Sequence, residues 1–177
     1  NLLKVRYGRH PGEDLARTWL IRNLRVEQHH ADYWVDWAEA SDVSRDALIA
    51  GTDDPATSAL AHWCWRTCER EALAISVAAT HYAIEGATGE WSNLVCSTPT
   101  YANLFAESER KKATRWLRQH AQYDDTHPWE ALDIMCTLLG NQPDPAQVTP
   151  IRTAICTSYR YMAMTLDRCM ALEQPAS

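Results

Sequence analysis

Residues 150–170, PIRTAICTSYRYMAMTLDRCM, contain the pattern that decides the fold class. Apolar side chains recur in this stretch about every 3.6 residues, at Ile151, Ile155, Tyr159, Met162, Leu166 and Cys169. That period is typical of an amphipathic helix with one buried face. We therefore expect a helix that starts near Pro150.

The rest of the chain shows the same helical pattern, together with signals that start and stop helices. Pro11, with Glu13 and Asp14 behind it, is typical of a helix N-terminus, where the backbone dipole favours acids. The other predicted helical segments run over about 11–40, 56–85 (one helix or a closely spaced pair, ending at Gly86), 100–124 and 128–140. No stretch alternates with period two for long enough to form a strand. The sequence predicts an all-α bundle, with residues 1–177 as a single domain.

Composition excludes several classes of protein. The formal net charge of −6 argues against a nucleic-acid binder, because phosphate contact needs a basic face. No apolar run approaches the roughly 20 residues that span a bilayer, and no signal peptide is visible. The six cysteines have no CxxC spacing, so we expect reduced, buried thiols in a cytoplasmic protein.

Glu27 and His30 form an ExxH motif within RVEQHHADYW. Positions three apart on a helix are separated by about 60° around its axis, so both side chains can reach one ion. A carboxylate with an imidazole suits iron or manganese, and this motif builds carboxylate di-iron sites in helical bundles. By itself the motif is also common on solvent-exposed helices.

A second group of ligand-type residues, His120, Asp124 and His127, lies in RQHAQYDDTHPWE. On one continuous helix, Asp124 would lie at about 40° and His127 at about −20° from His120, over two turns. Such a stack can bind two ions, although a polar face in water is the alternative. Because a residue before proline avoids the α region, Pro128 predicts that His127 lies at a helix end.

Glu85, in HYAIEGATGEW, follows an apolar segment and would be costly to bury without charged partners. His81, one turn earlier on the same face, is an alternative ligand. Two Fe(II) ions would compensate the three carboxylates of Glu27, Glu85 and Asp124 and leave one positive charge. A site of that charge would accept an anionic substrate such as a carboxylate, with open positions for O2.

These motifs, together with RYGRHPGED, resemble those of the haem-oxygenase-like di-iron oxidases, which are relatives of the TenA and PqqC proteins. Within that group the chain is most similar to the UndA family of 1-alkene-forming fatty acid decarboxylases, from about Tyr7 to Leu172. Members of that family carry a further N-terminal segment, so we expect one to be missing before Asn1.

The resemblance implies a helical bundle of the haem-oxygenase-like (TenA/PqqC) type that holds two Fe(II) ions, the second of them labile. It assigns Glu27, His30 and His120 to one iron and Asp124 and His127 to the other, with Glu85 shared. The implied reaction uses O2 to remove a β-hydrogen from a medium-chain fatty acid such as lauric acid. Its products are a 1-alkene such as 1-undecene and CO2, and it uses an external electron donor.

Three other functions remain open at the level of sequence. Another di-iron enzyme of this scaffold could be an N-oxygenase or an oxidative lyase acting on an amino acid; a long apolar tunnel would favour the fatty acid over these. A TenA-type thiamin hydrolase would need a pocket cysteine and an acid instead of metal. A bundle that only binds iron is the non-catalytic alternative. Oligomeric state also stays open, with a homodimer among the options.

Overall fold

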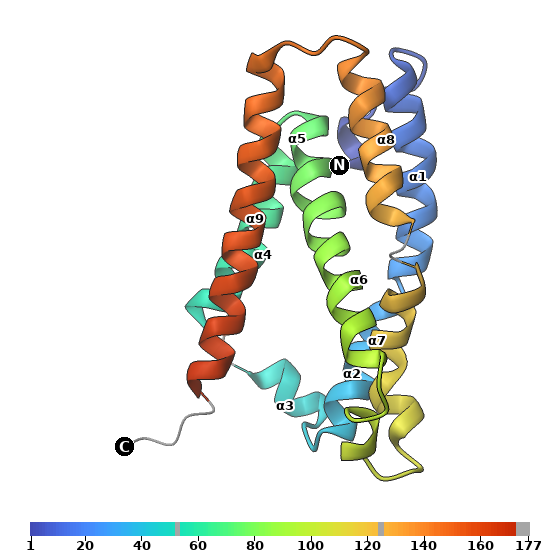
Figure 1. Ribbon diagram of the computed structural model, residues 1–177, viewed down its shortest axis with the longest axis vertical. Helices are drawn as coiled ribbons and strands as arrows, with labels where there is room; N and C mark the ends of the chain where they lie inside the picture. The colour runs from blue at the N-terminus through green and yellow to red at the C-terminus, as the bar shows by residue number, and fades with distance from the viewer. Residues whose placement is uncertain (52–53, 124–125, 173–177) are drawn as a thin grey trace.

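The computed structural model describes residues 1–51, 54–123 and 126–172, and within them every regular element is a helix (Figure 1). The main helices are α1 (Pro11–Glu27), α2 (His30–Ala40), α3 (Arg45–Ala50), α4 (Pro55–Arg70), α5 (Leu73–Val77), α6 (Ala83–Cys96), α7 (Arg110–Tyr123), α8 (His127–Leu139) and α9 (Pro145–Leu172). Short turns of other helix types are η1 (Leu2–Lys4), the π-helical η2 (Ala78–Tyr82) and η3 (Ala102–Leu104). The predicted all-α fold is confirmed.

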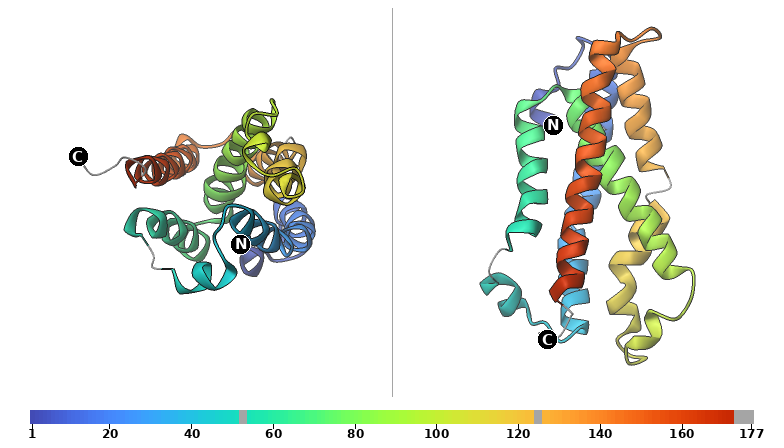
Figure 2. Two further views of the ribbon diagram at one scale, coloured as in Figure 1. Left: turned by 90° about the horizontal axis from the view of Figure 1, so that it is seen from below. Right: turned by 60° about the vertical axis from the view of Figure 1, so that its left-hand side comes forward.

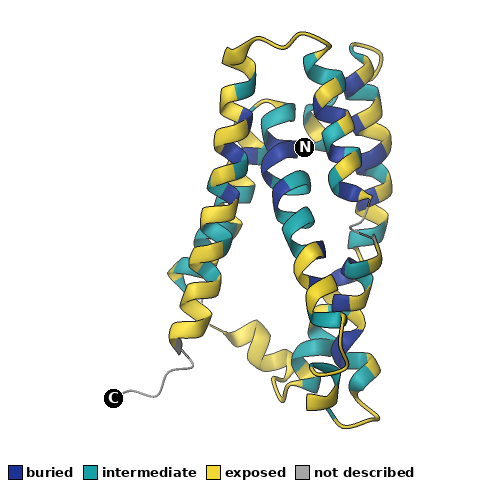
Figure 3. Cartoon of the chain, in the orientation of Figure 1, coloured by how far each residue is buried: buried dark blue, intermediate teal, exposed yellow. Residues whose placement is uncertain are grey.

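The helices pack as neighbouring pairs around the continuous column formed by α5, η2 and α6. Helix α1 packs on α8, α4 on α9, and α7 on both α2 and α6 (Figures 1 and 2). The apolar core lies where α1, α5, η2, α8 and α9 meet, and includes Trp19, Leu20, Val77 and Ile134. Figure 3 shows that buried residues are concentrated there, whereas α3 and the C-terminal part of α9 are largely exposed.

Local capping explains where α1 begins. Nδ1 of His10 accepts a hydrogen bond from the backbone N–H of Gly12 at 3.0 Å, and Pro11 occupies the first turn. Asp14 accepts a second backbone hydrogen bond, from Gly8 at 2.8 Å. The predicted start at Pro11 is therefore confirmed, and the cap aligns α1 for its contact with α8.

Several predicted boundaries are wrong. The segment predicted over 11–40 is divided at residues 28–29. The segment over 56–85, predicted as one helix or a closely spaced pair, is divided at residues 71–72. It does not end at Gly86, because α6 continues to Cys96. The glycine instead faces Pro128, where an added Cβ would lie 3.2 Å from Cγ.

Two predicted helix starts also move. Helix α7 begins at Arg110 instead of near residue 100, where only η3 is helical. Helix α9 begins at Pro145 instead of Pro150, because Asp144 caps it by accepting a hydrogen bond from the backbone N–H of Ala146 at 2.8 Å.

The six cysteines are free, but the prediction that they are buried is wrong. Cys136, Cys156 and Cys169 are exposed, and the other three are half-buried. No helix in the described part of the chain is long and apolar enough to cross a membrane.

The contact between α1 and α8 leaves no space for a side chain at Gly12. An added Cβ would lie 2.8 Å from both Cγ and the backbone nitrogen of Leu138. We therefore expect Gly12→Ala to lower the free energy of unfolding by about 1–3 kcal/mol, seen as a lower Tm in thermal melts followed by circular dichroism. At Gly51 an added Cβ would make only contacts of 3.4 Å, so Gly51→Ala is the matched control. Equal Tm values for the two variants would contradict this account of the contact.

Candidate functional site

Glu85 lies in the first turn of α6, between two histidines. Its Oε1 is 2.6 Å from Nδ1 of His81, one turn earlier in η2. Its Oε2 is 3.3 Å from Nδ1 of His127, the first residue of α8. Residues that are distant in the sequence therefore meet where η2, α6 and α8 come together, and His127 lies at a helix end as predicted.

The indole of Trp19, on α1, covers one side of this group. Its ring makes edge contacts with His81 and His127, with centroids 4.6 and 5.8 Å apart respectively. Trp19 is buried, and its Nε1 donates a hydrogen bond to Oε2 of Glu130 at 2.7 Å. The sequence analysis did not identify Trp19, because periodicity does not show which polar groups a buried ring will face.

The π-helical turn η2 was also missed. It occupies Ala78–Tyr82, contains His81 and leads directly into the helix that carries Glu85. Turns of this kind often occur at functional sites, because the extra residue changes which way the following side chains face. The sequence gives no periodic signal for a single π turn.

The pKa of Glu85 is shifted strongly by its surroundings. Burial favours the neutral form of Glu85, but hydrogen bonding and charge from His127 and His81 outweigh it and lower the pKa of Glu85 to about 2. Glu85 is therefore ionised at neutral pH. A buried carboxylate needs compensating positive charge, and in this structure the two histidines face it.

A second group contains Glu27, His30 and His120. Glu27 ends α1 and His30 begins α2, and the turn between them brings Oε2 of Glu27 to 2.8 Å from Nδ1 of His30. The imidazole of His30 lies against that of His120 on α7, with ring centroids 4.6 Å apart. Both histidines are buried.

His120 is oriented as a metal-ligating histidine would be. Its Nδ1 lies 2.8 Å from the carbonyl oxygen of Trp116, so an N–H at Nδ1 donates there and leaves a lone pair on Nε2. Burial lowers the pKa of His120, and the nearby His30 adds to that effect. The imidazole is thus held in the neutral form that can bind a cation.

The predicted ligands that the structure describes lie in these two groups. Among residues 1–51, 54–123 and 126–172, no three His, Cys, Asp or Glu side chains converge as a site for one metal ion. Asp124 lies outside the described residues. The proposed stacking of His120 and His127 on one helix is wrong, because α7 ends at Tyr123 and His127 begins α8. His81, the alternative ligand, hydrogen-bonds Glu85.

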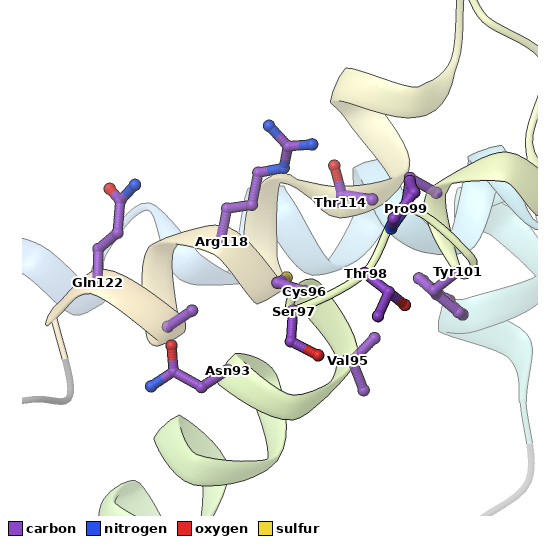
Figure 4. Close-up of a pocket in the computed structure, with 12 residues that line it drawn as sticks. Asn93, Val95, Cys96, Ser97, Thr98, Pro99, Tyr101, Thr114, Arg118 and Gln122 are labelled. Atoms are coloured by element: carbon purple, nitrogen blue, oxygen red, sulfur yellow. The ribbon is translucent and has the colours of Figure 1, made fainter.

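Two cavities lie along α6. One, of about 480 Å³, lies between the C-terminal end of α6 and α7, and Asn93, Arg118 and Gln122 are among the polar side chains that line it (Figure 4). The other has a volume of about 350 Å³ and is lined by Gly86 and Pro128. These two residues directly follow the predicted ligands Glu85 and His127 in the sequence. Its further lining residues are Tyr82, Ala87, Gly89, Glu90, Asn93, Trp129 and Tyr159.

Comparison with known proteins identifies a relative by structure. No family model matches the chain, and no curated protein matches it. The crystal structure of a TenA homolog from Pseudomonas syringae pv. tomato is 56% identical in sequence, with a TM-score of 0.92. The match covers 96% of this chain and 70% of that one. The helical bundle is therefore of the TenA/PqqC type, and this chain belongs to the TenA-like family.

Proposed function

We propose that this chain is a non-haem iron oxidase that converts medium-chain saturated fatty acids to terminal alkenes and CO2 with O2. One observation carries the proposal: an ionised, half-buried Glu85 lies between two histidines, in a bundle that also brings Glu27 against His30, whose ring contacts that of His120. Such a set of carboxylates and imidazoles on several helices suits a site for two iron ions.

The donor chemistry of the described residues fits iron. His120 is neutral and keeps a lone pair on Nε2. Nδ1 of His30 is buried close to Glu27 but is not aligned for a hydrogen bond to any described residue, so it can face a cation instead. Glu27, His30 and His120, whose side chains would have to converge further than they do in this structure, would hold one ion. His127 with Asp124 would hold the other, with Glu85 shared. Iron bound there supplies the activation of O2 for removal of a β-hydrogen.

The chain's own residues would bind and orient the substrate. Two Fe(II) ions with three carboxylates leave one positive charge, which favours a substrate carboxylate. The cavity of about 350 Å³ beside Gly86 and Pro128 is within the size range of small-ligand pockets, and the rings of Tyr82, Trp129 and Tyr159 offer apolar surface to an alkyl chain. Trp19 covers the Glu85 group and limits the access of water.

A metal-free hydrolase that uses a nucleophilic cysteine is less well supported. Burial raises the pKa of the Cys64 thiol to about 11 and also raises that of Cys96, so both stay protonated at neutral pH. The groups around Glu85 and His120 are built from histidines, carboxylates and tryptophans.

A second candidate, an N-oxygenase or oxidative lyase acting on an amino acid, uses the same metal. Glu90 and Asn93 line the cavity beside Gly86 and could bind an amino group. Substrate-dependent uptake of O2 distinguishes the two candidates. A fatty acid should stimulate the uptake in the first case, and an amino acid in the second.

The proposed reaction is tested by loading the chain with Fe(II) under anaerobic conditions and adding O2 with saturated fatty acids from octanoic to hexadecanoic. We expect a 1-alkene one carbon shorter than the acid, measured by mass spectrometry of the headspace. Iron that is bound without alkene from any of these acids would contradict the proposal. Uptake of O2 stimulated by amino acids would then favour the second candidate.

Removing the charge of Glu85 should weaken iron binding. We expect Glu85→Gln to lower the affinity for Fe(II) by more than about tenfold, since changes even to groups behind metal ligands have effects of that size. Iron content after dialysis, measured by elemental analysis, reports the change. Glu69→Gln, on the exposed face of α4, is the control. Equal iron content in the two variants would exclude Glu85 as a ligand.

The charge of Glu85 also predicts a pH dependence of stability in the metal-free chain. The pKa of Glu85 falls from its ordinary 4.5 to about 2 on folding, so ionised Glu85 stabilises the fold fully above pH 4.5. This contribution is lost as the pH falls from 4.5 towards 2. Urea unfolding of wild type and Glu85→Gln with chelator should therefore give a difference in free energy that shrinks over this window. A difference that is independent of pH would contradict the lowered pKa.

A further inference from the structure

Four tryptophans connect His120 to the surface through ring contacts. The Trp116 ring lies on that of His120, with centroids 3.8 Å apart. Trp37 stacks on Trp116 at 5.6 Å, with 27° between the ring planes. Trp34 makes edge contacts with Trp37 and Trp116 at 5.0 and 5.2 Å. Trp91 lies 6.3 Å from Trp37 and 6.4 Å from Trp116.

The outer end of this cluster reaches solvent. Trp34, on α2, is 48% exposed and Trp91, on α6, is 41% exposed. The indole N–H of Trp37 donates a hydrogen bond to the Tyr101 hydroxyl at 2.7 Å, which holds the middle of the cluster in place. A cavity of about 300 Å³ lined by Trp34, Trp37 and Tyr101 opens beside them. At the inner end, His120 is buried.

Packing between α2, α6 and α7 does not by itself require indoles. Leucine or phenylalanine would fill the same apolar space, yet the chain has eight Trp and a single Phe, and four of the eight Trp lie here. Indole loses one electron far more readily than phenyl. Because the rate of electron tunnelling falls exponentially with distance, a series of rings in contact is faster than one long step.

The proposed reaction needs electrons that its substrate does not supply. A saturated fatty acid carboxylate that becomes a terminal alkene, CO2 and one proton releases two electrons. Reduction of O2 to two waters takes four electrons and four protons. Two electrons must therefore come from an external one-electron reductant of the ascorbate type, and His120, at the inner end of the cluster, is buried.

We propose that Trp34, Trp37, Trp91 and Trp116 form an electron relay between a reductant at the surface and His120. The relay rests on the proposed iron chemistry. Trp116 gives one electron towards the site and regains one from Trp37, Trp34 or Trp91. An exposed indole that has been oxidised loses its N–H proton to water, then regains one electron from the reductant and one proton from water. Two such cycles supply the two missing electrons.

The test exposes the Fe(II)-loaded chain to O2 without substrate or reductant. The exposed indoles then stay oxidised, so we expect a tryptophan radical in freeze-quench electron paramagnetic resonance. Peptide mass spectrometry should also find oxygenated products at Trp34 or Trp91. In Trp116→Phe, which keeps an aromatic ring and the backbone carbonyl that faces His120, both signals should fall to background while iron content is unchanged. Trp65→Phe, at an exposed position on α4, is the matched control and should keep both signals.

A second variant changes the two exposed tryptophans of the cluster and leaves Trp37 and Trp116 in place. In the double variant Trp34→Phe with Trp91→Phe, added ascorbate should reduce the radical much more slowly than in wild type. This measurement covers the case in which Trp116→Phe does not fold, which thermal melts would reveal.

Two results would overturn the relay. Bound iron and consumption of O2, with no tryptophan radical or with equal signals in wild type and Trp116→Phe, would refute the relay and leave the oxygen chemistry standing. Failure of the wild-type chain to bind iron or consume O2 would refute the proposed function, and the relay with it.

Discussion

The carboxylate of Glu85, ionised inside the bundle, is the constraint around which this structure is organised. A carboxylate held inside a protein is costly unless polar partners face it closely, and here His81 and His127 do so at 2.6 and 3.3 Å. Those two histidines belong to η2 and α8, and Trp19 of α1 covers both rings. The position of three helices is thus tied to one acidic side chain.

The contacts that stabilise Glu85 are also those that a metal would replace. A cation bound by Glu85 and His127 would replace the contact between these two side chains, and His81 would remain as a hydrogen-bond partner behind the carboxylate. At the second group, His120 is already fixed by the Trp116 carbonyl, so metal binding there would need no change of tautomer. The two groups therefore differ in how much rearrangement metal binding would require.

Sequence reasoning predicted the fold class because helical periodicity and helix starts are local properties, as at Pro11 and Pro128. It also selected Glu27, His30, Glu85 and His120, which the structure brings into two groups. It failed where tertiary packing decides: Gly86 marked a helix end in sequence, but α6 continues to Cys96 and the glycine packs closely against Pro128. The predicted stack of His120 and His127 assumed one continuous helix, whereas α7 ends at Tyr123 and His127 begins α8.

The proposed oxygen chemistry needs electrons at His120, which is buried. Tryptophans lie beside both groups of predicted ligands. Trp19 covers the Glu85 group with a ring that donates a hydrogen bond to Glu130, whereas Trp116 begins a series of ring contacts from His120 to the exposed Trp34. The same residue type thus has two environments, and its contacts, rather than its frequency in the chain, determine whether it covers the site or connects it to the surface.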